Sequence, residues 1–472
     1  MNFGGLLNIA RSGLATSQAQ IAVTSQNVTN AQTPGYSRQR LQIQASTPQV
    51  LPQGIFGTGV QSEGAERMRN ELMDWSFRRD SQGASFAEER RDALQAVENI
   101  LGEPSTTGLA SSFEALWNSW SDLSTNPNSS AARGVVRQRG AQVAAQLNQF
   151  GNQVTDAQTV MRSRLIEKVD RVNALASQVA DINQRIVAAE SSGNQSPDMR
   201  DQRDAKIDEL ASLIGATAYP QADGSVNVNI GGDSLVDGAN FKTVRLQGVI
   251  SSPTRLGIAL GEPPVPGAAT ETMYNIGGAV SGMLDGYNTV FPGALTALDS
   301  VARALVINTN TLHRTGFIGT AAAGDFFDAT RTTARTIRLD TTIEADADRI
   351  ASSGSSGQNG DNTVALALSQ LRSRPVTVDG LPVTATNPSA LISERYRTVV
   401  AGVAANVSSA NGTAEAMRTL TSQSDARRES IKGVSIDEEM VNLMKFQQSY
   451  AAAARLISVV DELSQTLINM AR

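Results

Sequence analysis

A serine that could act as a nucleophile lies near the middle of the chain. Ser234 stands in the run Gly232-Asp233-Ser234-Leu235. A serine nucleophile needs a base within hydrogen-bonding reach and a third group that orients the base. The chain has a single histidine, His313, and Asn310 stands three residues before it, where a hydrolase of this kind would carry an aspartate. Because Ser234 also follows an alternating strand pattern, a turn at a strand end explains the motif better than an active site does.

Residues that hold metals, cofactors or nucleic acids are scarce. The absence of cysteine and the single histidine exclude thiolate sites and histidine clusters. Asp201, Asp204 and Asp208 are predicted to lie on a solvated helix face. The glycines from Gly54 to Gly59 are spaced Gly-x-x-Gly-x-Gly, which does not fit a dinucleotide fingerprint. A formal net charge of −6, from 40 basic and 46 acidic residues, does not favour a phosphate-binding surface. We therefore predict no catalytic residue, cofactor, metal or nucleic-acid partner.

The chain shows no targeting or membrane signal. Its N-terminus lacks a basic region, and its apolar run is broken at Asn8 and Arg11. No stretch is expected to reach the apolar length that a membrane span needs. These features alone favour the cytoplasm, unless the chain is exported without a cleaved signal.

The two ends of the chain read as amphipathic helices. Residues 4–31 repeat one large apolar residue every seven positions, with Ala10, Ser17 and Thr24 between them. Burial of so weak a stripe cannot offset the conformational entropy lost on ordering, which is roughly 1–2 kcal/mol for each residue. We therefore expect the terminal helices to be poorly ordered in an isolated chain and to fold against partners, the alternative being a helix docked on its own domain. The last helix opens at Gly433, where Ser435 and Glu438 fit a capping box, and runs to about residue 471.

The middle of the chain predicts an elongated rod. Helices are expected at 71–101, 109–123 and 198–213, the last capped by Ser196 and Pro197. Three-four apolar spacing without proline predicts one helix over 129–190, roughly 90 Å long at 1.5 Å per residue, with Gly140 and Gly151 as candidate bends. Helical spacing returns over 284–312, where Gly286 and Pro292 should kink the helix, and again over 396–420.

Smaller β elements decorate these helices. Residues 41–70 predict a strand and a β-hairpin, and alternating residues around 226–230 and 241–246 predict a β excursion. Residues 319–390 are irregular, with Gly324–Phe327 as an apolar anchor. The fold class is thus mainly α with a smaller β part, as an elongated multi-helix rod with a coiled-coil end. The expected domains are a terminal coiled-coil assembly domain (1–40 with 431–472), an elongated helical domain (41–320 with 391–430, its β excursion at about 216–270) and a small mixed or irregular segment (321–390).

The segment 25–40, SQNVTNAQTPGYSRQR, ends the first helix. Pro34 removes a backbone donor and disfavours the α conformation at Thr33. Gly35 supplies the positive φ of a tight turn. Local physics therefore predicts a helix exit into an extended segment.

The same segment carries a resemblance to a known family. Asn27-Val28-Thr29-Asn30-Ala31 and then Thr33-Pro34-Gly35-Tyr36 are similar to the N-terminal signature of bacterial flagellar rod, hook and hook-associated proteins. Gln447 and Tyr450 match the Gln-x-x-Tyr of their last helix. Features that resemble the hook–filament junction members are Tyr36-Ser37-Arg38, the GVSIDEE run from Gly433, and the segments Asp201–Asp204, Asn308–Phe317 and Gly324–Phe327.

The resemblance implies a structural adaptor that joins hook to filament and is not an enzyme. It implies type III export without a cleaved signal peptide, an extracellular place in the bacterial flagellum, and no membrane partner. The implied partners are other copies in a homo-oligomeric ring, the hook protein, a second hook-associated junction protein and an export chaperone on the C-terminal helix. Many members carry an outer β domain after Gly-Asp-Phe-Phe, and the stretch here is too short for a full copy. The alternatives are a rod or hook subunit of the same superfamily and, remotely, a GDSL-like hydrolase built on Ser234.

The residues predicted to form the assembly interface come from both ends of the chain. They are Leu7, Leu14, Ile21, Asn27, Val28, Asn30, Thr33, Pro34, Gly35, Tyr36, Leu443, Phe446, Tyr450, Ala453, Ile457, Val460, Leu463 and Leu467.

Overall fold

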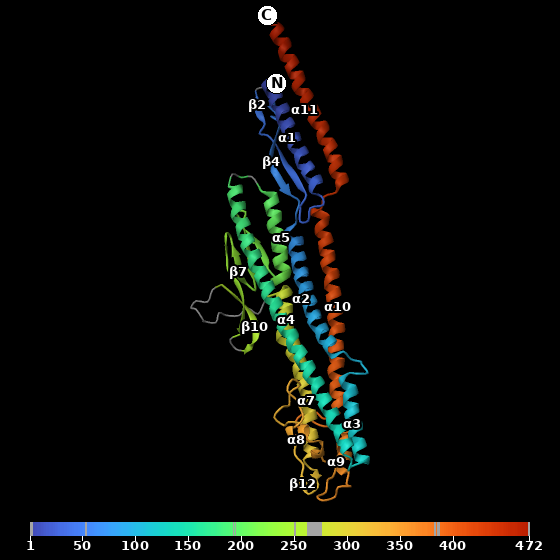
Figure 1. Ribbon diagram of the computed structural model, residues 1–472. Coiled ribbons are helices and arrows are strands. Elements are labelled where there is room, and N and C mark those ends of the chain that lie inside the picture. The colour runs from blue at the N-terminus through green and yellow to red at the C-terminus, as the bar shows by residue number, and fades with distance from the viewer. Residues whose placement is uncertain are drawn as a thin grey trace.

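The protein is a long rod of helices with both termini at one end (Figure 1). A computed structural model describes residues 3–51, 54–191, 193, 195–249, 252–261, 276–381, 384 and 388–470. The helices are α1 (Phe3–Asn30), α2 (Glu71–Leu101), α3 (Leu109–Thr125), α4 (Ser130–Glu190), α5 (Pro197–Ile214), α6 (Gly278–Asp285), α7 (Phe291–His313), α8 (Thr341–Ala345), α9 (Thr363–Ser369), α10 (Ile392–Lys432) and α11 (Ile436–Met470). The predicted fold class, mainly helical with a smaller β part, is confirmed.

Helix α4 is the longest element, as its periodicity predicted. Its 61 residues form one helix, and the side chain of Ser129 caps its start by accepting the N–H of Ala132 at 3.1 Å. The helix continues through Gly140 and Gly151. At these two positions a Cβ would lie 2.8 Å from the ring of Phe326 and 2.5 Å from the side chain of Arg335. The glycines therefore allow close packing of the 321–340 segment on α4.

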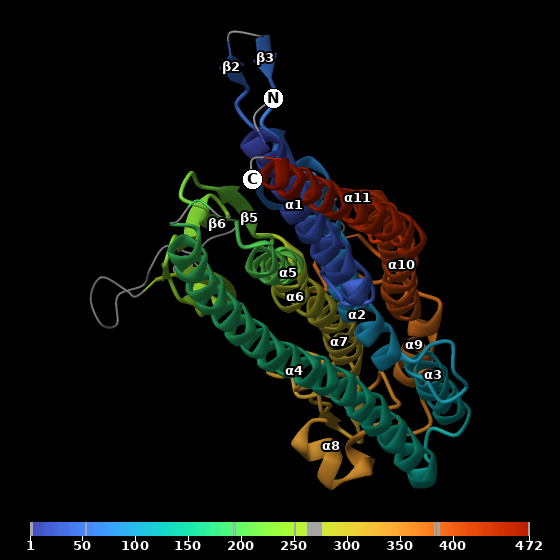
Figure 2. The same ribbon diagram turned by 90° about the horizontal axis from the view of Figure 1, so that it is seen from above.

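Local signals explain where the neighbouring helices begin and end. Asn70 caps α2 by accepting the N–H groups of Leu72 and Met73, and Gly102 ends α2 with φ of 56°. Ser196 precedes α5 as expected, but its hydroxyl donates to Glu190 at 2.8 Å instead of capping the helix. Helix α10 packs along α2, and α5 packs between α2 and α4 (Figure 2).

The helical stretch Gly278–His313 is irregular where glycine and proline predicted a kink. A π-helical turn, Gly286–Val290, joins α6 to α7. Contrary to the expectation that no stretch is this long, Gly278–His313 is long and apolar enough to cross a membrane by length and composition. Its most apolar window is 44% buried inside the protein, and Val280, Leu298 and Leu305 of this stretch belong to the hydrophobic core cluster.

The β elements are small and antiparallel. The strands are β1 (Gln39–Ala45), β2 (Gln49–Leu51), β3 (Gly54–Phe56), β4 (Val60–Arg67), β5 (Thr217–Pro220), β6 (Val226–Ile230), β7 (Asp233–Asp237), β8 (Asn240–Phe241), β9 (Val244–Val249), β10 (Ser252–Leu260), β11 (Phe317–Ile318) and β12 (Ala321–Ala322). Sheet β5-β6-β7-β8 is the largest, and β1 pairs with β4 beside α1. The predicted excursion beyond residue 261 lies outside the described residues.

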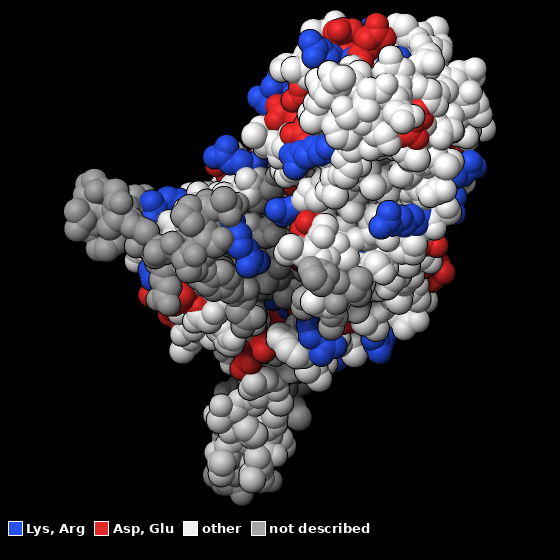
Figure 3. Space-filling model, turned by 90° about the horizontal axis from the view of Figure 1, so that it is seen from below, with Lys and Arg blue, Asp and Glu red and all other residues white. Residues whose placement is uncertain are grey.

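The core at the far end of the rod is an aromatic cluster. Trp120, Phe326 and Phe327 are fully buried, and the ring centroids of Trp120 and Phe326 are 5.3 Å apart. The apolar anchor predicted at Gly324–Phe327 thus packs against α3. Seen from this end, basic and acidic side chains are interspersed among uncharged ones on the visible face (Figure 3).

Helices α1 and α11 lie side by side at the other end of the rod (Figures 1 and 2). Between α10 and α11 the chain is extended at Gly433, where a Cβ would meet the carbonyl oxygen of Glu429 at 2.5 Å. Ser435 makes half of the expected capping box, because its hydroxyl receives the N–H of Glu438 at 3.5 Å. The structure pairs α1 with α11, and the poor order expected of both ends in an isolated chain stays a prediction.

Candidate functional site

Asn27, near the end of α1, joins three parts of the chain. Its side chain is 1% exposed. The amide nitrogen donates to the carbonyl oxygen of Gln39 at 2.9 Å and to Glu439 of α11 at 3.0 Å. The amide oxygen accepts the N–H of Gln39 and the hydroxyl of Tyr36, both at 2.9 Å. One asparagine therefore fixes the helix end, the start of β1 and the first turn of α11.

The predicted turn follows Asn27 directly. Gly35 has φ of 83°, and the N–H of Tyr36 donates to the carbonyl oxygen of Thr33 at 3.2 Å. Burial, and then the nearby carboxylates of Asp198, Asp201 and Glu439, raise the pKa of Tyr36 above its ordinary value. The phenol therefore stays protonated and remains a donor to Asn27.

The next residues connect this turn to α5 and α11. Ser37 donates from its N–H and its hydroxyl to the two carboxylate oxygens of Asp201, both at 2.7 Å. Arg38 forms ion pairs with Glu438 at 3.0 Å and Glu439 at 2.7 Å. We call this set, Asn27, Tyr36, Ser37, Arg38, Gln39, Asp201, Glu438 and Glu439, the terminal joint, because it connects the paired terminal helices to the rod.

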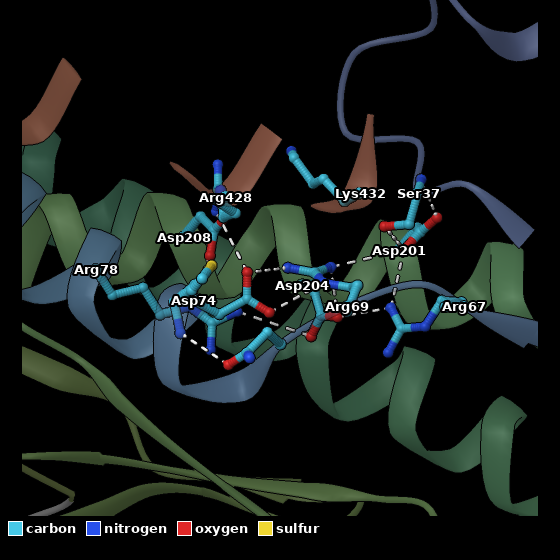
Figure 4. Close-up of polar contacts among 12 residues, drawn as sticks. Ser37, Arg67, Arg69, Asp74, Arg78, Asp201, Asp204, Asp208, Arg428 and Lys432 are labelled. Atoms are coloured by element: carbon cyan, nitrogen blue, oxygen red, sulfur yellow. Dashed lines mark hydrogen bonds and ion pairs between the residues drawn. The ribbon is translucent and has the colours of Figure 1, made fainter. Parts of the chain in front are cut away.

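Beneath the terminal joint lies a buried ion network (Figure 4). Arg67 contacts Asp201 at 2.8 Å and Asp204 at 2.7 Å, and Arg69 contacts Asp204 at 2.8 Å. Asp208 pairs with Arg78 of α2 and Arg428 of α10, both at 2.6 Å. The network therefore links β4, α2, α5 and α10. We call it the ion network; its members are Arg67, Arg69, Asp74, Arg78, Asp201, Asp204, Asp208 and Arg428.

The prediction that Asp201, Asp204 and Asp208 lie on a solvated helix face is wrong. Asp201 is 6% exposed and Asp204 is 9% exposed. Burial alone would raise the pKa of Asp204, but Arg69, Arg67 and Arg78 outweigh burial and lower it to about 2. The spacing i, i+3, i+7 places the three aspartates on one helix stripe with buried Ala211, which is the signal that sequence reasoning missed.

Small residues of α1, rather than its large ones, form the seam with α11. Ala10, Ser17 and Thr24 are buried, whereas Leu7 is 44% exposed and the other large members of its row are only half-buried: Leu14, Ile21 and Val28. Gly13 faces Ala453 of α11, because a Cβ atom added at Gly13 would lie 3.8 Å from the Cβ atom of Ala453. The two helices thus approach closely with little apolar burial.

Helix α11 has two apolar faces. One contacts α1 and carries Glu439, Phe446, Ala453 and Val460, seven residues apart. The other is open, with side chains between 47% and 73% exposed at Val441, Leu456, Val459, Leu463 and Met470. We call these five residues the open face. Of the predicted interface residues, Leu443 and Ile457 are half-buried, while Tyr450, Leu463 and Leu467 are exposed.

Among the described residues, Ser234 has no catalytic partners. It lies in β7, and its hydroxyl donates to the carbonyl oxygen of Val236 at 3.2 Å. His313 is fully buried, and both of its ring nitrogens are used within the core: Nδ1 meets the carbonyl oxygen of Gly324 at 2.8 Å, and Nε2 accepts the N–H of Ala351 at 3.0 Å. In the part of the chain that the structure describes, no group of three or more histidine or acidic residues could hold a metal ion.

Protonation of His313 should destabilise the fold. Burial lowers its pKa below the ordinary 6.5, so the unfolded chain binds a proton at a higher pH than the folded chain. The free energy of unfolding is therefore unaffected by the protonation of His313 above pH 6.5. It falls by at most about 1.4 kcal/mol per pH unit as the pH drops from 6.5 towards the pKa of His313 in the folded chain. Urea unfolding at pH 7, 6 and 5 should show this loss in the wild type and a shallower slope in His313→Asn. Equal slopes in the two proteins would contradict the assignment.

A rod with paired ends and an open apolar face is typical of a structural subunit of an assembly. Comparison with known proteins agrees with this class. Residues 94–327 match the family described as flagellar hook-associated protein FlgK helical domain. Residues 7–36 match flagella basal body rod protein, and residues 430–470 match flagellar basal body rod FlgEFG protein C-terminal.

The chain belongs to the flagellar hook-associated protein 1 family. It is 30% identical to flagellar hook-associated protein 1 of Bacillus subtilis over 505 residues, which cover 98% of this chain and 97% of that protein. It is 22% identical to the Escherichia coli protein of the same name, over 98% and 99% of the two chains. The solved structure of the flagellar hook junction protein FlgK from Burkholderia pseudomallei has the same fold, with a TM-score of 0.65 at 15% identity over 77% of this chain and all of that one. The chain is therefore a structural component of the bacterial flagellum that assembles with other flagellar components, and the family confirms the prediction that it is not an enzyme.

Proposed function

We propose that this chain joins hook to filament and assembles through its terminal helices. The open face of α11 carries the proposal. Five large apolar side chains on one helix are exposed while α1 already occupies the other apolar face. Exposed apolar surface of this kind marks a protein–protein contact. Neighbouring copies in a homo-oligomeric ring, the hook protein and a second junction protein are the proposed occupants.

The predicted interface residues divide into two roles under this proposal. Residues of the terminal joint, among them Asn27 and Tyr36, set the direction of α11 relative to the rod through the contacts given above. Residues on the outer side of α11, such as Leu463 and Leu467, meet neighbouring subunits. Before assembly an export chaperone would cover the same helix, and export through the type III apparatus would need no cleaved signal peptide.

The position of the protein on the flagellum tests the proposal. Immunogold labelling of isolated flagella should place it at the boundary between hook and filament. Labelling along the hook, or along the rod, would instead identify a rod or hook subunit, which is the alternative within the same superfamily.

Replacing Leu463 with glutamate should block assembly without unfolding the monomer. The side chain is 47% exposed, so the free energy of unfolding should change by no more than about 0.5 kcal/mol. Burying a leucine contributes about 1.5–3 kcal/mol, so association at each contact should weaken roughly ten- to hundredfold. Sedimentation of the purified chain and motility of cells that carry the variant measure the effect.

Gln465→Glu is the matched control. It adds the same charge two residues away, at an exposed position outside the open face, and should assemble normally. Normal assembly of Leu463→Glu, or equal failure of both variants, would remove the open face from the interface.

A further inference from the structure

A cavity of about 700 Å³ lies between the start of α2, α5 and the turn from β5 to β6. It borders the ion network, and several network arginines form part of its wall. The arginines of the wall are Arg67, Arg69, Arg78, Arg79, Arg200 and Arg203. Guanidinium groups match the geometry of carboxylates and other oxyanions, because each presents a planar fork of donors.

The buried carboxylates of this wall are already engaged by arginines other than Arg203, whereas Glu66 and Glu71, which also line the cavity, are exposed to solvent. The carboxylate of Asp204 accepts hydrogen bonds from Arg67 and Arg69. The carboxylate of Glu190 accepts two hydrogen bonds from Arg200, at 2.8 and 2.5 Å. Six guanidiniums belong to the wall or the network and are largely buried: Arg67, Arg69, Arg78, Arg200, Arg203 and Arg428. All of them except Arg203 lie within ion-pair distance of a carboxylate, and Arg428 also meets the half-exposed Asp425 at 3.0 Å.

Arg203 is the one of these six that makes no ion pair with a carboxylate among the described residues, although the charges of Asp204 and Glu190 act on it from farther away. It is 3% exposed and lines the cavity. Its Nη1 donates only to neutral oxygens, the side-chain oxygen of Asn183 at 3.0 Å and the carbonyl oxygen of Gly224 at 2.8 Å. Its Nε is buried and has no hydrogen-bond partner. Burial lowers the pKa of Arg203 to about 10, so the group is still charged at neutral pH.

An uncompensated buried cation is costly, and an anion placed beside it offsets that cost. The cavity has room for such a group, and its rim also offers apolar surface. Trp75 is 48% exposed there and Leu72 is 72% exposed. The guanidinium of Arg79 stands 5.1 Å from the ring centroid of Trp75.

We propose that this cavity is an oxyanion-binding site in which Arg203 supplies a buried positive charge that no ion pair engages. The ligand is a sulfate-like ion from solution or the carboxylate of an acidic side chain from an adjacent subunit. The two sources share one chemistry, a planar or tetrahedral group of anionic oxygens. The site is separate from the open face of α11, and it is independent of the proposed junction role.

Arginine Nε–Hε signals of the ¹⁵N-labelled full chain test the site directly. In one arm, the monomer is titrated with sodium sulfate and, at equal ionic strength, with sodium chloride. In the other arm, the assembled protein is observed by solid-state NMR without added oxyanion. A saturable shift of the Arg203 signal with sulfate and not with chloride identifies a free ion as ligand. A shift of the same signal on assembly alone identifies a carboxylate of a neighbouring chain.

Arg203→Gln should weaken sulfate binding at least tenfold in calorimetric titrations, whereas Arg372→Gln, at a half-exposed position away from the cavity, should leave it unchanged. If Arg203→Gln does not fold, Arg79→Gln at the half-exposed rim should still weaken binding several-fold. An Arg203 signal that moves in neither arm, or equal sulfate affinity in wild type and the cavity variants, would overturn the proposal.

Discussion

Replacing Asp204 with alanine should lower the free energy of unfolding by about 3–5 kcal/mol, the cost of breaking a buried ion pair by removing one partner. Asp204 receives Arg67 at 2.7 Å and Arg69 at 2.8 Å, and Arg78 stands 3.8 Å away. Without this carboxylate, buried positive charges face one another with less compensation. Urea unfolding at pH 7 measures the loss.

The pH dependence of this loss identifies its electrostatic origin. The pKa of Asp204 is lowered from 3.8 to about 2 in the folded chain. Its stabilisation is therefore complete above pH 3.8 and disappears as the pH falls through about 2. The difference between wild type and Asp204→Ala should shrink over this window. Asp170→Ala, at an exposed position of α4, is the matched control and should change stability by no more than about 0.5 kcal/mol. A loss that stays constant down to pH 2 would indicate a packing defect instead.

Long helices could be predicted from the sequence because their signals are local. The three-four apolar spacing lies within α4 itself, and the capping serine, Ser129, stands directly before it. The turn at Thr33–Tyr36 was equally accessible, since proline and glycine restrict the backbone wherever they occur. The strand and hairpin near residues 39–67 could likewise be predicted, because alternating residues and turn glycines are also local signals.

Contacts between distant segments could not be predicted in this way. From its local sequence, Asp204 is predicted to lie on the surface. Its burial depends on Arg67 and Arg69, which stand 137 and 135 residues earlier in the chain. The glycines of α4 read as bends, because the Phe326 ring that packs on Gly140 comes from another element. Apolar periodicity predicts a seam of α1 built on its large residues, because it gives most weight to leucine and isoleucine. The structure buries the row of small residues, which allows α11 to approach more closely.

A chain that ends at Gly433 should keep its rod and lose assembly completely. The hydrophobic core cluster of the rod contains no residue of α11 among the residues described. Thermal unfolding of the rod should therefore change by only a few degrees, since a ΔΔG of about 1 kcal/mol shifts the midpoint by that much. Assembly should be absent because the whole open face is removed, and the proposed binding of an export chaperone to the C-terminal helix should be lost with it.

The same truncation should release α1. In the full chain α1 is held by its seam with α11, and Asn27 donates to Glu439 at 3.0 Å. A helix in a protein owes most of its stability to the packing of its apolar face, and the apolar stripe of α1 is weak. Amide exchange over residues 4–30 should accelerate in the truncated chain, while α4, buried along one side by α3, α5 and α7, stays protected. If α1 remained protected and the truncated chain still formed junctions, the terminal helix pair could not be the element that drives assembly.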